Sequence, residues 1–540
     1  MSALRAAEPL TPAPHVAKAI ARATPRERAA PILPPRVMLD PLDNITPELA
    51  HRLAAFELDD LGNAERLAYL YGERILFVPG IGWHVYDGRR WARDETAEVP
   101  RLAARMVRAL FEVAGDIAKS AGRDGEADPE AVAKSAAALL KHAVRSAKGR
   151  GIALAVEKLR DEQEVKRVHV LAEQLDADLH LLNVANGTVD LRTGELRPHD
   201  PRDLITKLAP VAYDPDASAP RWLAFQNSIT NGDADLIAWK RRAFGYTATG
   251  ETREQALVIA YGRGSNGKST EQEVIADALG DYADVAAFTT FAAGRNGQVK
   301  RFGLAHLAGA RYVRATEGNA GDQLAEGTVK AITGGDTITA EFKGRDEFTF
   351  KPRMKLWLGT NHRPNVSGTD EGIWRRLRLV PYPVRFERPT KANPNPPHPI
   401  DADLPDKLRD ELPGILAWIV AGAREWYAHG LGECEAVTGA TDDYRADMDT
   451  LGDFMRECVS TSDPGGRELS SRLLDAHRGW CRGNRQAPLD AKAFKTALIE
   501  RGMTPKRYTA GVAWPGVTLT ELGERYATAE QNVEGARYGR

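Results

Sequence analysis

Apolar and polar residues change their spacing several times along the chain, and each spacing predicts a different element. Residues 74–94 alternate on either side of Asp87-Gly88, which predicts two antiparallel strands joined by a turn. Apolar residues then recur every three or four positions, the spacing of one helix face. This spacing predicts helices at about 99–120, 128–148 and 150–175. Short strands with a turn at Asn186-Gly187 follow, so the first part of the chain is expected to be an α+β domain.

The pattern changes most sharply at residues 256–270, which read ALVIAYGRGSNGKST. A short apolar run predicts a buried strand, and it breaks directly into a glycine-rich loop. The helix expected next has an apolar face between Val274 and Leu279 and ends at Gly280. This order of strand, loop and helix predicts an α/β domain with a phosphate-binding loop.

Composition and periodicity together divide the chain into several expected domains. Ala, Pro and Arg without periodicity predict a disordered arm at the N-terminus, and prolines mark a connector after the α/β domain. The predicted boundaries are 1–45 for the arm, 46–215 for the α+β domain, 216–386 for the α/β domain, 387–436 for the connector and a helical region, 437–520 for a C-terminal domain and 521–540 for a flexible tail.

Charge and cysteine content narrow the range of partners. The formal net charge of -2 over 540 residues gives no overall attraction to DNA, so any contact with nucleic acid needs local basic patches. Cys434, Cys458 and Cys481 are too far apart for a zinc or disulfide framework. The chain has no run of 18 apolar residues and no signal-peptide core. We therefore expect no membrane contact and a location in the cytoplasm.

The glycine-rich loop fits the pattern G-x-x-x-x-G-K-[ST] through Gly262, Gly267, Lys268 and Ser269. Backbone N–H groups of such a loop point at phosphate oxygens, the lysine reaches the β- and γ-phosphates, and the serine hydroxyl binds Mg²⁺. The sequence therefore predicts ATP and Mg²⁺ as ligands. The predicted nucleotide-binding residues are Gly262, Arg263, Gly264, Ser265, Asn266, Gly267, Lys268, Ser269 and Thr270.

Two further segments end in polar residues suited to the same site. Glu317 ends the β-prone stretch 307–317, and such an acid normally follows the strand next to the loop strand, where it holds Mg²⁺ and orients water. Asn361 follows a second apolar strand, 354–358. Its amide could contact the γ-phosphate or the attacking water, or it could cap a turn before Pro364.

Arg375 and Arg376 follow Trp374 and precede another expected strand. Their position favours an arginine that stabilises charge on the γ-phosphate of a neighbouring subunit. Packing of both side chains on Trp374 is the structural alternative.

The segments GRGSNGKST, RYVRATE, VKAITGGDTITAEFKGRDEF, LGTNHRP and GIWRRLRL, in this order, resemble superfamily 3 helicases of the phage and plasmid primase-helicase type. The resemblance covers about 220–430, and residues 181–215 and 437–520 are similar to the domains that flank the motor in this family. It implies an AAA+-like P-loop ATPase core in a homo-oligomeric, hexameric ring, which moves 3′-to-5′ along single-stranded or forked DNA.

The resemblance also implies a role for each matching residue. Lys268 and Ser269 take phosphate and Mg²⁺, Glu317 the metal and water, Asn361 the sensor, and Arg376, or second Arg375, the arginine finger. Lys330 and Asp336 lie in the motif before the sensor strand. Lys343 and Arg345 near the tip of a following hairpin would contact DNA phosphates. Glu271 stands where an apolar residue is usual in this family.

The C-terminal domain is expected to be a winged helix. Helices at about 467–483 and 489–501 precede a hairpin at Tyr508–Leu519. Lys492 and Lys495 on the second helix, with Lys506 and Arg507 at the base of the wing, would bind DNA, although such domains also bind proteins.

Taken together, the sequence predicts an ATP-dependent, ring-forming replicative DNA helicase of a phage, plasmid or other mobile element. One alternative is a replication initiator that binds and melts origin DNA with ATP as an assembly switch. A small-molecule P-loop kinase is disfavoured by the arginine pair and the basic hairpin. Residues 46–215 contain no Asp-x-Asp strand and no metal-spaced cysteines, so we expect no primer synthesis by this chain and a separate primase or polymerase as partner.

Overall fold

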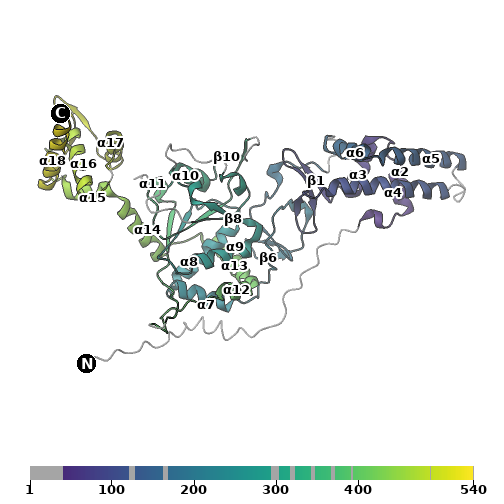
Figure 1. The fold of residues 1–540 in the computed structure, drawn as a ribbon, viewed down its shortest axis with the longest axis horizontal. Helices are drawn as coiled ribbons and strands as arrows, with labels where there is room; N and C mark the ends of the chain where they lie inside the picture. Colours follow the sequence, from purple (N-terminus) through teal and green to yellow (C-terminus); the bar gives the residue numbers. More distant parts are fainter. Residues whose placement is uncertain are drawn as a thin grey trace.

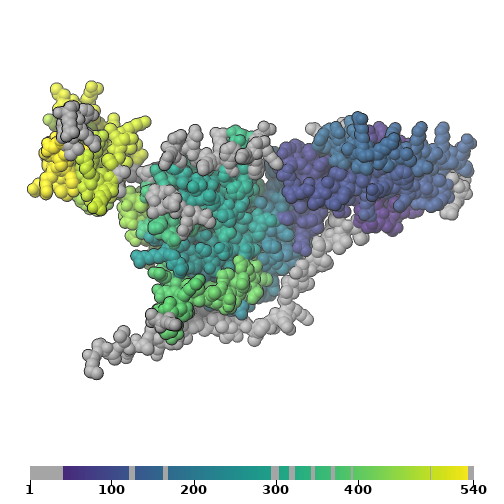
Figure 2. All heavy atoms as spheres, in the orientation of Figure 1, coloured from purple at the N-terminus to yellow at the C-terminus, as the bar shows by residue number. Residues whose placement is uncertain are grey.

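The computed structural model has three lobes: a helical N-terminal lobe, a central lobe built on a parallel sheet, and a C-terminal lobe (Figures 1 and 2). It is a mixed α/β, multidomain architecture, as predicted. The structure describes residues 40–120, 128–161, 168–293, 303–316, 323–341, 347–366, 371–390, 393–486 and 488–538.

The N-terminal lobe packs helices beside a small antiparallel sheet. The elements are α2 Pro47–Ala54, α3 Asp60–Tyr71, β1 Ile75–Val78, β2 Gly82–Tyr86, β3 Trp91–Arg93, α4 Glu98–Ser120, α5 Pro129–Ser146 and α6 Gly149–Asp161. The predicted hairpin forms between β2 and β3, with Gly88 at a positive φ of 95°. The third predicted helix is shorter than expected because His169 pairs with Phe77 in an extended bridge, which a helical backbone cannot do.

Five parallel strands form the central sheet in the order β13-β7-β12-β9-β8. Their bounds are β7 Leu257–Tyr261, β8 Ala283–Ala287, β9 Tyr312–Thr316, β12 Lys355–Thr360 and β13 Leu377–Pro381. Leu257 and Ile259 of β7 join one hydrophobic core, whereas Val258 and Ala260 join the core on the opposite face. Because both faces are covered, the strand is apolar throughout.

Helices cover both faces of this sheet. α7 Pro220–Ile229, α8 Ala234–Ala248, α9 Lys268–Leu279 and α13 Leu412–His429 cover one face, and α10 Glu326–Gly334 and α11 Glu371–Trp374 cover the other. α8 and α13 cross at backbone contact: a Cβ on Gly245 would lie 2.0 Å from the nitrogen of Ala423, and one on Gly422 would lie 2.0 Å from the carbonyl oxygen of Arg241. Glycine at both positions therefore lets α13 pack directly against α8.

One hydrophobic core crosses the boundaries that we drew at 215 and 386. Leu182 and Val189, from the antiparallel strands β4 Leu181–Val184 and β5 Gly187–Asp190, belong to the same cluster as Trp222 of α7 and Trp418 of α13. β6 Glu195–Arg197 completes that small sheet, and α12 Leu404–Arg409 precedes α13. These segments are therefore part of the central lobe.

The C-terminal lobe follows a long helix, α14 Glu435–Met448. Its other elements are α15 Thr450–Cys458, β14 Val459–Ser460, β15 Arg467–Leu469, α16 Ser470–Gly483, α17 Ala491–Glu500, β16 Lys506–Tyr508, β17 Gly511–Pro515, β18 Thr518–Leu519 and α18 Glu521–Tyr538. The predicted hairpin is formed by β16 and β17 and ends before Leu519, because β18 pairs with β14 instead.

The prediction of a flexible tail at 521–540 was wrong for most of its length. Glu521–Tyr538 form α18, which packs along α16. A Cβ on Gly479 of α16 would lie 2.5 Å from the carbonyl oxygen of Tyr526, and Arg482 forms an ion pair of 2.7 Å with Glu530. Packing against α16 holds this segment in place, and Thr520, whose hydroxyl accepts a hydrogen bond from the backbone nitrogen of Gly523, caps the start of the helix.

Among the described residues, we find no helix that combines the length and the apolar character needed to cross a membrane.

Candidate functional site

The glycine-rich loop and the segment after β12 begin side by side at the carboxyl edge of the sheet. Tyr261, the last residue of β7, pairs in parallel with Thr360, the last residue of β12. Gly262 and Asn361 are the next residues of each strand, so the two loops emerge as neighbours. Ligands of open parallel sheets bind at this carboxyl edge.

The loop is compact because two of its glycines have no room for a side chain. A Cβ on Gly262 would lie 2.4 Å from Nδ2 of Asn266 and 2.6 Å from the carbonyl oxygen of Tyr382. Gly267 has a φ of +85°, and a Cβ there would lie 2.6 Å from Cγ2 of Ile229. Gly267 then caps α9, whose first residue is Lys268.

Lys268 points back into this loop and across to the neighbouring one. Its side chain is buried, and Nζ donates hydrogen bonds to the carbonyl oxygen of Gly262 at 2.7 Å and to Oδ1 of Asn361 at 3.0 Å. Nδ2 of Asn266 is also buried and has no hydrogen-bond partner among the described residues. The ammonium group of Lys268, the unpaired Nδ2 of Asn266 and the N-terminus of α9 therefore lie close together. This arrangement favours the binding of an anion.

Of the two predicted metal ligands, the structure describes Ser269 alone. Ser269 is exposed in the first turn of α9, close to Lys268. Glu317 lies outside the described residues, directly after the end of β9. Within the described ranges no group of three His, Cys, Asp or Glu side chains could hold a metal ion.

The order of the strands corrects one expectation. We placed the strand of Glu317 next to the loop strand, but β12 lies between β7 and β9. The amide of Asn361 thus ends the adjacent strand, and the segment carrying Glu317 starts one strand further away. Both strands still end at the same edge because they are parallel.

The two arginines after Trp374 have different surroundings. Arg376 is only 8% exposed, and its guanidinium donates to Oγ1 of Thr333 at 3.2 Å and to the carbonyl oxygen of Gly372 at 2.5 Å. Arg375 is exposed and donates to Oε1 of Gln255 at 3.1 Å. Of the two, only Arg375 offers a guanidinium at the surface of the lobe.

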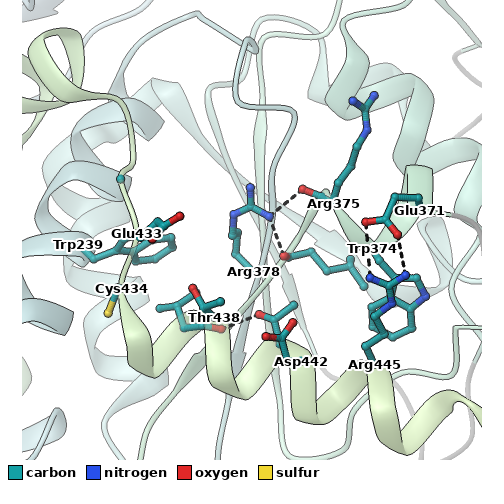
Figure 3. Close-up of a pocket in the computed structure, with 14 residues that line it drawn as sticks. Trp239, Glu371, Trp374, Arg375, Arg378, Glu433, Cys434, Thr438, Asp442 and Arg445 are labelled. Carbon is teal, nitrogen blue, oxygen red and sulfur yellow. Dashed lines mark hydrogen bonds and ion pairs between the residues drawn. The ribbon is translucent and has the colours of Figure 1, made fainter.

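A cavity of about 300 Å³ lies beside Arg375, between β13, α11 and α14 (Figure 3). Arg378 of β13 points toward this side and donates to the carbonyl oxygens of Arg375 and Leu377. Burial lowers the pKa of Arg378, and the charge of Glu254 opposes that effect. Arg445 of α14 reaches across to Glu371.

Glu271, the unusual acid after the loop, belongs to a buried polar network that sequence reasoning missed. It is fully buried and forms an ion pair of 2.7 Å with Lys240 of α8, itself 1% exposed. Gln226 donates to Glu271 at 2.6 Å, and the hydroxyl of Tyr382 donates to it as well. Burial lowers the pKa of Lys240, and the carboxylate of Glu271 offsets only part of this effect. No local signal in α8 marks Lys240 as its partner.

The predicted DNA contacts lie in two separate places. β10 Ile338–Glu341 and β11 Glu347–Phe350 form the expected antiparallel hairpin, but its tip with Lys343 and Arg345 lies outside the described residues. On the C-terminal lobe, Lys492 and Lys495 of α17 and Lys506 and Arg507 of β16 are all exposed. Lys330 is half-buried on α10, and Asp336 is exposed just after it.

Two family models match the chain. Residues 64–231 match the "D5 N terminal like" family, and residues 260–376 match a family of unknown function, DUF5906. The second match contains the glycine-rich loop, β12 and both arginines.

Curated relatives come from large DNA viruses. A protein of Acanthamoeba polyphaga mimivirus named "putative helicase" is 27% identical over 326 residues, which is 57% of this chain and 34% of that protein. A protein of African swine fever virus named "putative primase" is 24% identical over 344 residues, covering 60% of this chain and 36% of that protein. The chain thus spans about a third of the length of these relatives.

Among solved structures, the chain is similar to the C-terminal region of NrS-1, with a TM-score of 0.34 and 12% identity over 51% of this chain and 58% of that one.

Proposed function

Because the chain belongs to the phage-type primase-helicase family, we propose that it is an ATP-dependent DNA helicase of a mobile element's replication machinery. The observation that carries the proposal is the contact of Lys268 with Asn361 at the carboxyl edge of β7 and β12. It places the proposed phosphate-binding lysine against an amide that follows the adjacent strand, which supports a role for Asn361 as the γ-phosphate sensor.

The proposed substrate is ATP. Lys268 would exchange its bonds to Gly262 and Asn361 for phosphate oxygens, and the buried donor of Asn266 would gain an acceptor. Loop N–H groups and the α9 terminus would bind the same phosphates. The strand order β13-β7-β12-β9-β8 supports an AAA+-like core of the superfamily 3 type.

Ser269 would hold Mg²⁺, with Glu317 as the second proposed ligand. The bound metal ion would neutralise negative charge on the phosphates. Asn361 would orient the attacking water or the γ-phosphate without adding charge. In a ring, Arg375 would reach the phosphate of a neighbouring subunit, since it is exposed whereas Arg376 is bonded within its own subunit.

The ring is proposed to be a hexamer that moves 3′-to-5′ on single-stranded or forked DNA. Lys343 and Arg345 would contact phosphates in the ring channel. The C-terminal lobe, with α16, α17 and the β15-β17-β16 sheet, supports a winged helix whose lysines bind DNA. A separate primase or polymerase would supply primer synthesis.

The test combines imaging with an unwinding assay. Wild type and Lys268→Ala are imaged by negative stain with ATP and forked DNA, and strand displacement is measured for both. Rings, unwinding by wild type and none by Lys268→Ala are expected. Slow ATP turnover with origin-specific binding and no strand displacement would favour a replication initiator instead.

A further inference from the structure

Helix α14 contacts two segments at the edge of the proposed nucleotide site. These are the sensor segment, residues 361–364, and the arginine segment, residues 371–376. Tyr444 of α14 is fully buried, and its hydroxyl donates a hydrogen bond to the carbonyl oxygen of Pro364. Its ring meets the ring of Trp374 edge-on, with centroids 5.3 Å apart. Pro364 closely follows Asn361, and Trp374 directly precedes Arg375. One side chain therefore joins the sensor segment to the arginine segment.

Two ion pairs flank this joint. Asp447 binds Arg363 at 2.7 Å, and Arg445 binds Glu371 at 2.6 Å, a contact visible in Figure 3. The guanidinium of Arg363 also lies 4.9 Å from the ring centroid of Tyr261, the last residue before the glycine-rich loop. The α14 contacts thus reach the end of β7 as well.

α14 is itself fixed on the sheet. Oγ1 of Thr441 accepts a hydrogen bond of 3.0 Å from the backbone nitrogen of Leu379, so the helix covers the outer edge of β13. Beyond Met448, Asp449 caps α15 and forms an ion pair with Arg501 of the C-terminal lobe. The helix therefore connects that lobe directly to the two segments.

We propose that Tyr444 and the pairs Arg445–Glu371 and Asp447–Arg363 are positioning elements for ATP hydrolysis. They hold Asn361 and Arg375 in a fixed relation without touching the nucleotide. This inference rests on the proposed function. Arg445, Glu371 and Asp447 are exposed, whereas Arg363 is half-buried. Ion pairs with exposed partners contribute little to stability, so the effect of these pairs should appear in turnover rather than in folding.

The experiment uses the full chain with single-stranded DNA and compares Tyr444→Phe, Arg445→Glu and the double variant Arg445→Glu/Glu371→Arg. We measure kcat for ATP hydrolysis and the Kd of a fluorescent ATP analogue. Arg445→Glu should lower kcat about tenfold with Kd changed by less than about twofold, because misplacement of catalytic groups slows chemistry more than binding. Tyr444→Phe should act in the same direction, and the double variant should regain most of the kcat.

Arg409→Glu is the matched control, because Arg409 forms a similarly exposed ion pair with Asp277, at 2.8 Å, away from both segments. Its kcat should equal that of wild type. If Tyr444→Phe and Arg445→Glu both keep the wild-type kcat, the inference is wrong and the proposed function is unaffected. A double variant as slow as Arg445→Glu, or loss of analogue binding together with a lower Tm, would overturn it in favour of a purely structural role. Absence of hydrolysis in wild type would overturn the proposed function and the inference together.

Discussion

Nζ of Lys268 and Oδ1 of Asn361 lie 3.0 Å apart, which ties the first turn of α9 to the end of β12. The two residues are 93 positions apart in the sequence. Parallel pairing of β7 with β12 brings them together, since the residues that follow Tyr261 and Thr360 start at the same level of the sheet. A phosphate bound by Lys268 would therefore lie within reach of the side-chain amide of Asn361.

Asn361→Ala should lower ATP turnover about 100-fold, the usual effect of removing one preorganised donor. Binding of an ATP analogue should change only a few-fold, because Lys268 and the loop remain. Asn361→Asp should also weaken binding, since its carboxylate would pair with Lys268 and repel phosphate. Turnover and analogue binding check both variants, with Asn227→Ala on α7 as control. Normal turnover in Asn361→Ala would remove the sensor role.

The arginine pair should separate into two effects. Arg375→Ala should leave stability within about 0.5 kcal/mol of wild type, because the side chain is exposed. Turnover should fall about 1000-fold if it acts as the finger. Arg376→Ala should destabilise the central lobe by about 1–3 kcal/mol, because Thr333 and Gly372 lose a buried partner.

Mixing inactive subunits shows whether Arg375 acts across an interface. A mixed ring of Arg375→Ala and Lys268→Ala subunits contains interfaces at which both residues are wild type. We expect partial recovery of ATP turnover on mixing, whereas each variant alone is inactive. If the mixture is as inactive as each variant alone, Arg375 does not act on the nucleotide of a neighbouring subunit.

Local sequence patterns predicted those parts of the candidate site that depend on residues close together in the sequence. Gly262, Gly267 and Lys268 follow from one short motif, and Asn361 follows from an apolar strand with a polar end. The surroundings of Arg376 could not be predicted this way, because Thr333 lies 43 positions earlier and meets it only through the packing of α10. The pairing of Lys240 with Glu271 and the docking of α18 depend on tertiary contacts in the same way.

Glu271→Leu should destabilise the central lobe by about 3–5 kcal/mol, because it leaves the ammonium of Lys240 buried without its carboxylate. The double variant Glu271→Leu/Lys240→Met should recover most of this loss, since neither charge then remains. Amide hydrogen exchange along α9 measures the effect within this multi-lobe protein. Asp277→Leu, which removes an exposed acid from the same helix, should cost less than about 1 kcal/mol. An equal loss in Asp277→Leu would mean that burial of the pair is not the cause.

The C-terminal lobe should lose stability in mild acid through His477. Burial, with a smaller effect of Arg478, lowers the pKa of this side chain from 6.5 to about 4. The unfolded chain therefore binds more protons than the folded one between these values. Stability should fall as the pH drops from about 6.5 to 4, by at most about 3 kcal/mol, and level off below.

Amide exchange along α16, corrected for intrinsic rates, measures this slope. His477→Phe should flatten it, because a phenyl ring can keep the contacts of His477 with Phe454 and Phe494 without titrating. A slope that persists in His477→Phe would assign the acid sensitivity to carboxylates in the lobe.

Replacing Lys492 and Lys495 by alanine should weaken DNA binding without regard to sequence. Both lysines are exposed on α17, where they can reach phosphates. Each lost phosphate contact should reduce the slope of log Kd against log salt by about 0.9 on duplex DNA, or about 0.7 on single strands. Fluorescence anisotropy over a salt series measures this slope. Lys141→Ala, on the exposed side of α5, is the control and should leave it unchanged. If the double variant keeps the wild-type slope, α17 does not face the DNA backbone, and the C-terminal lobe would then serve as a protein-binding module.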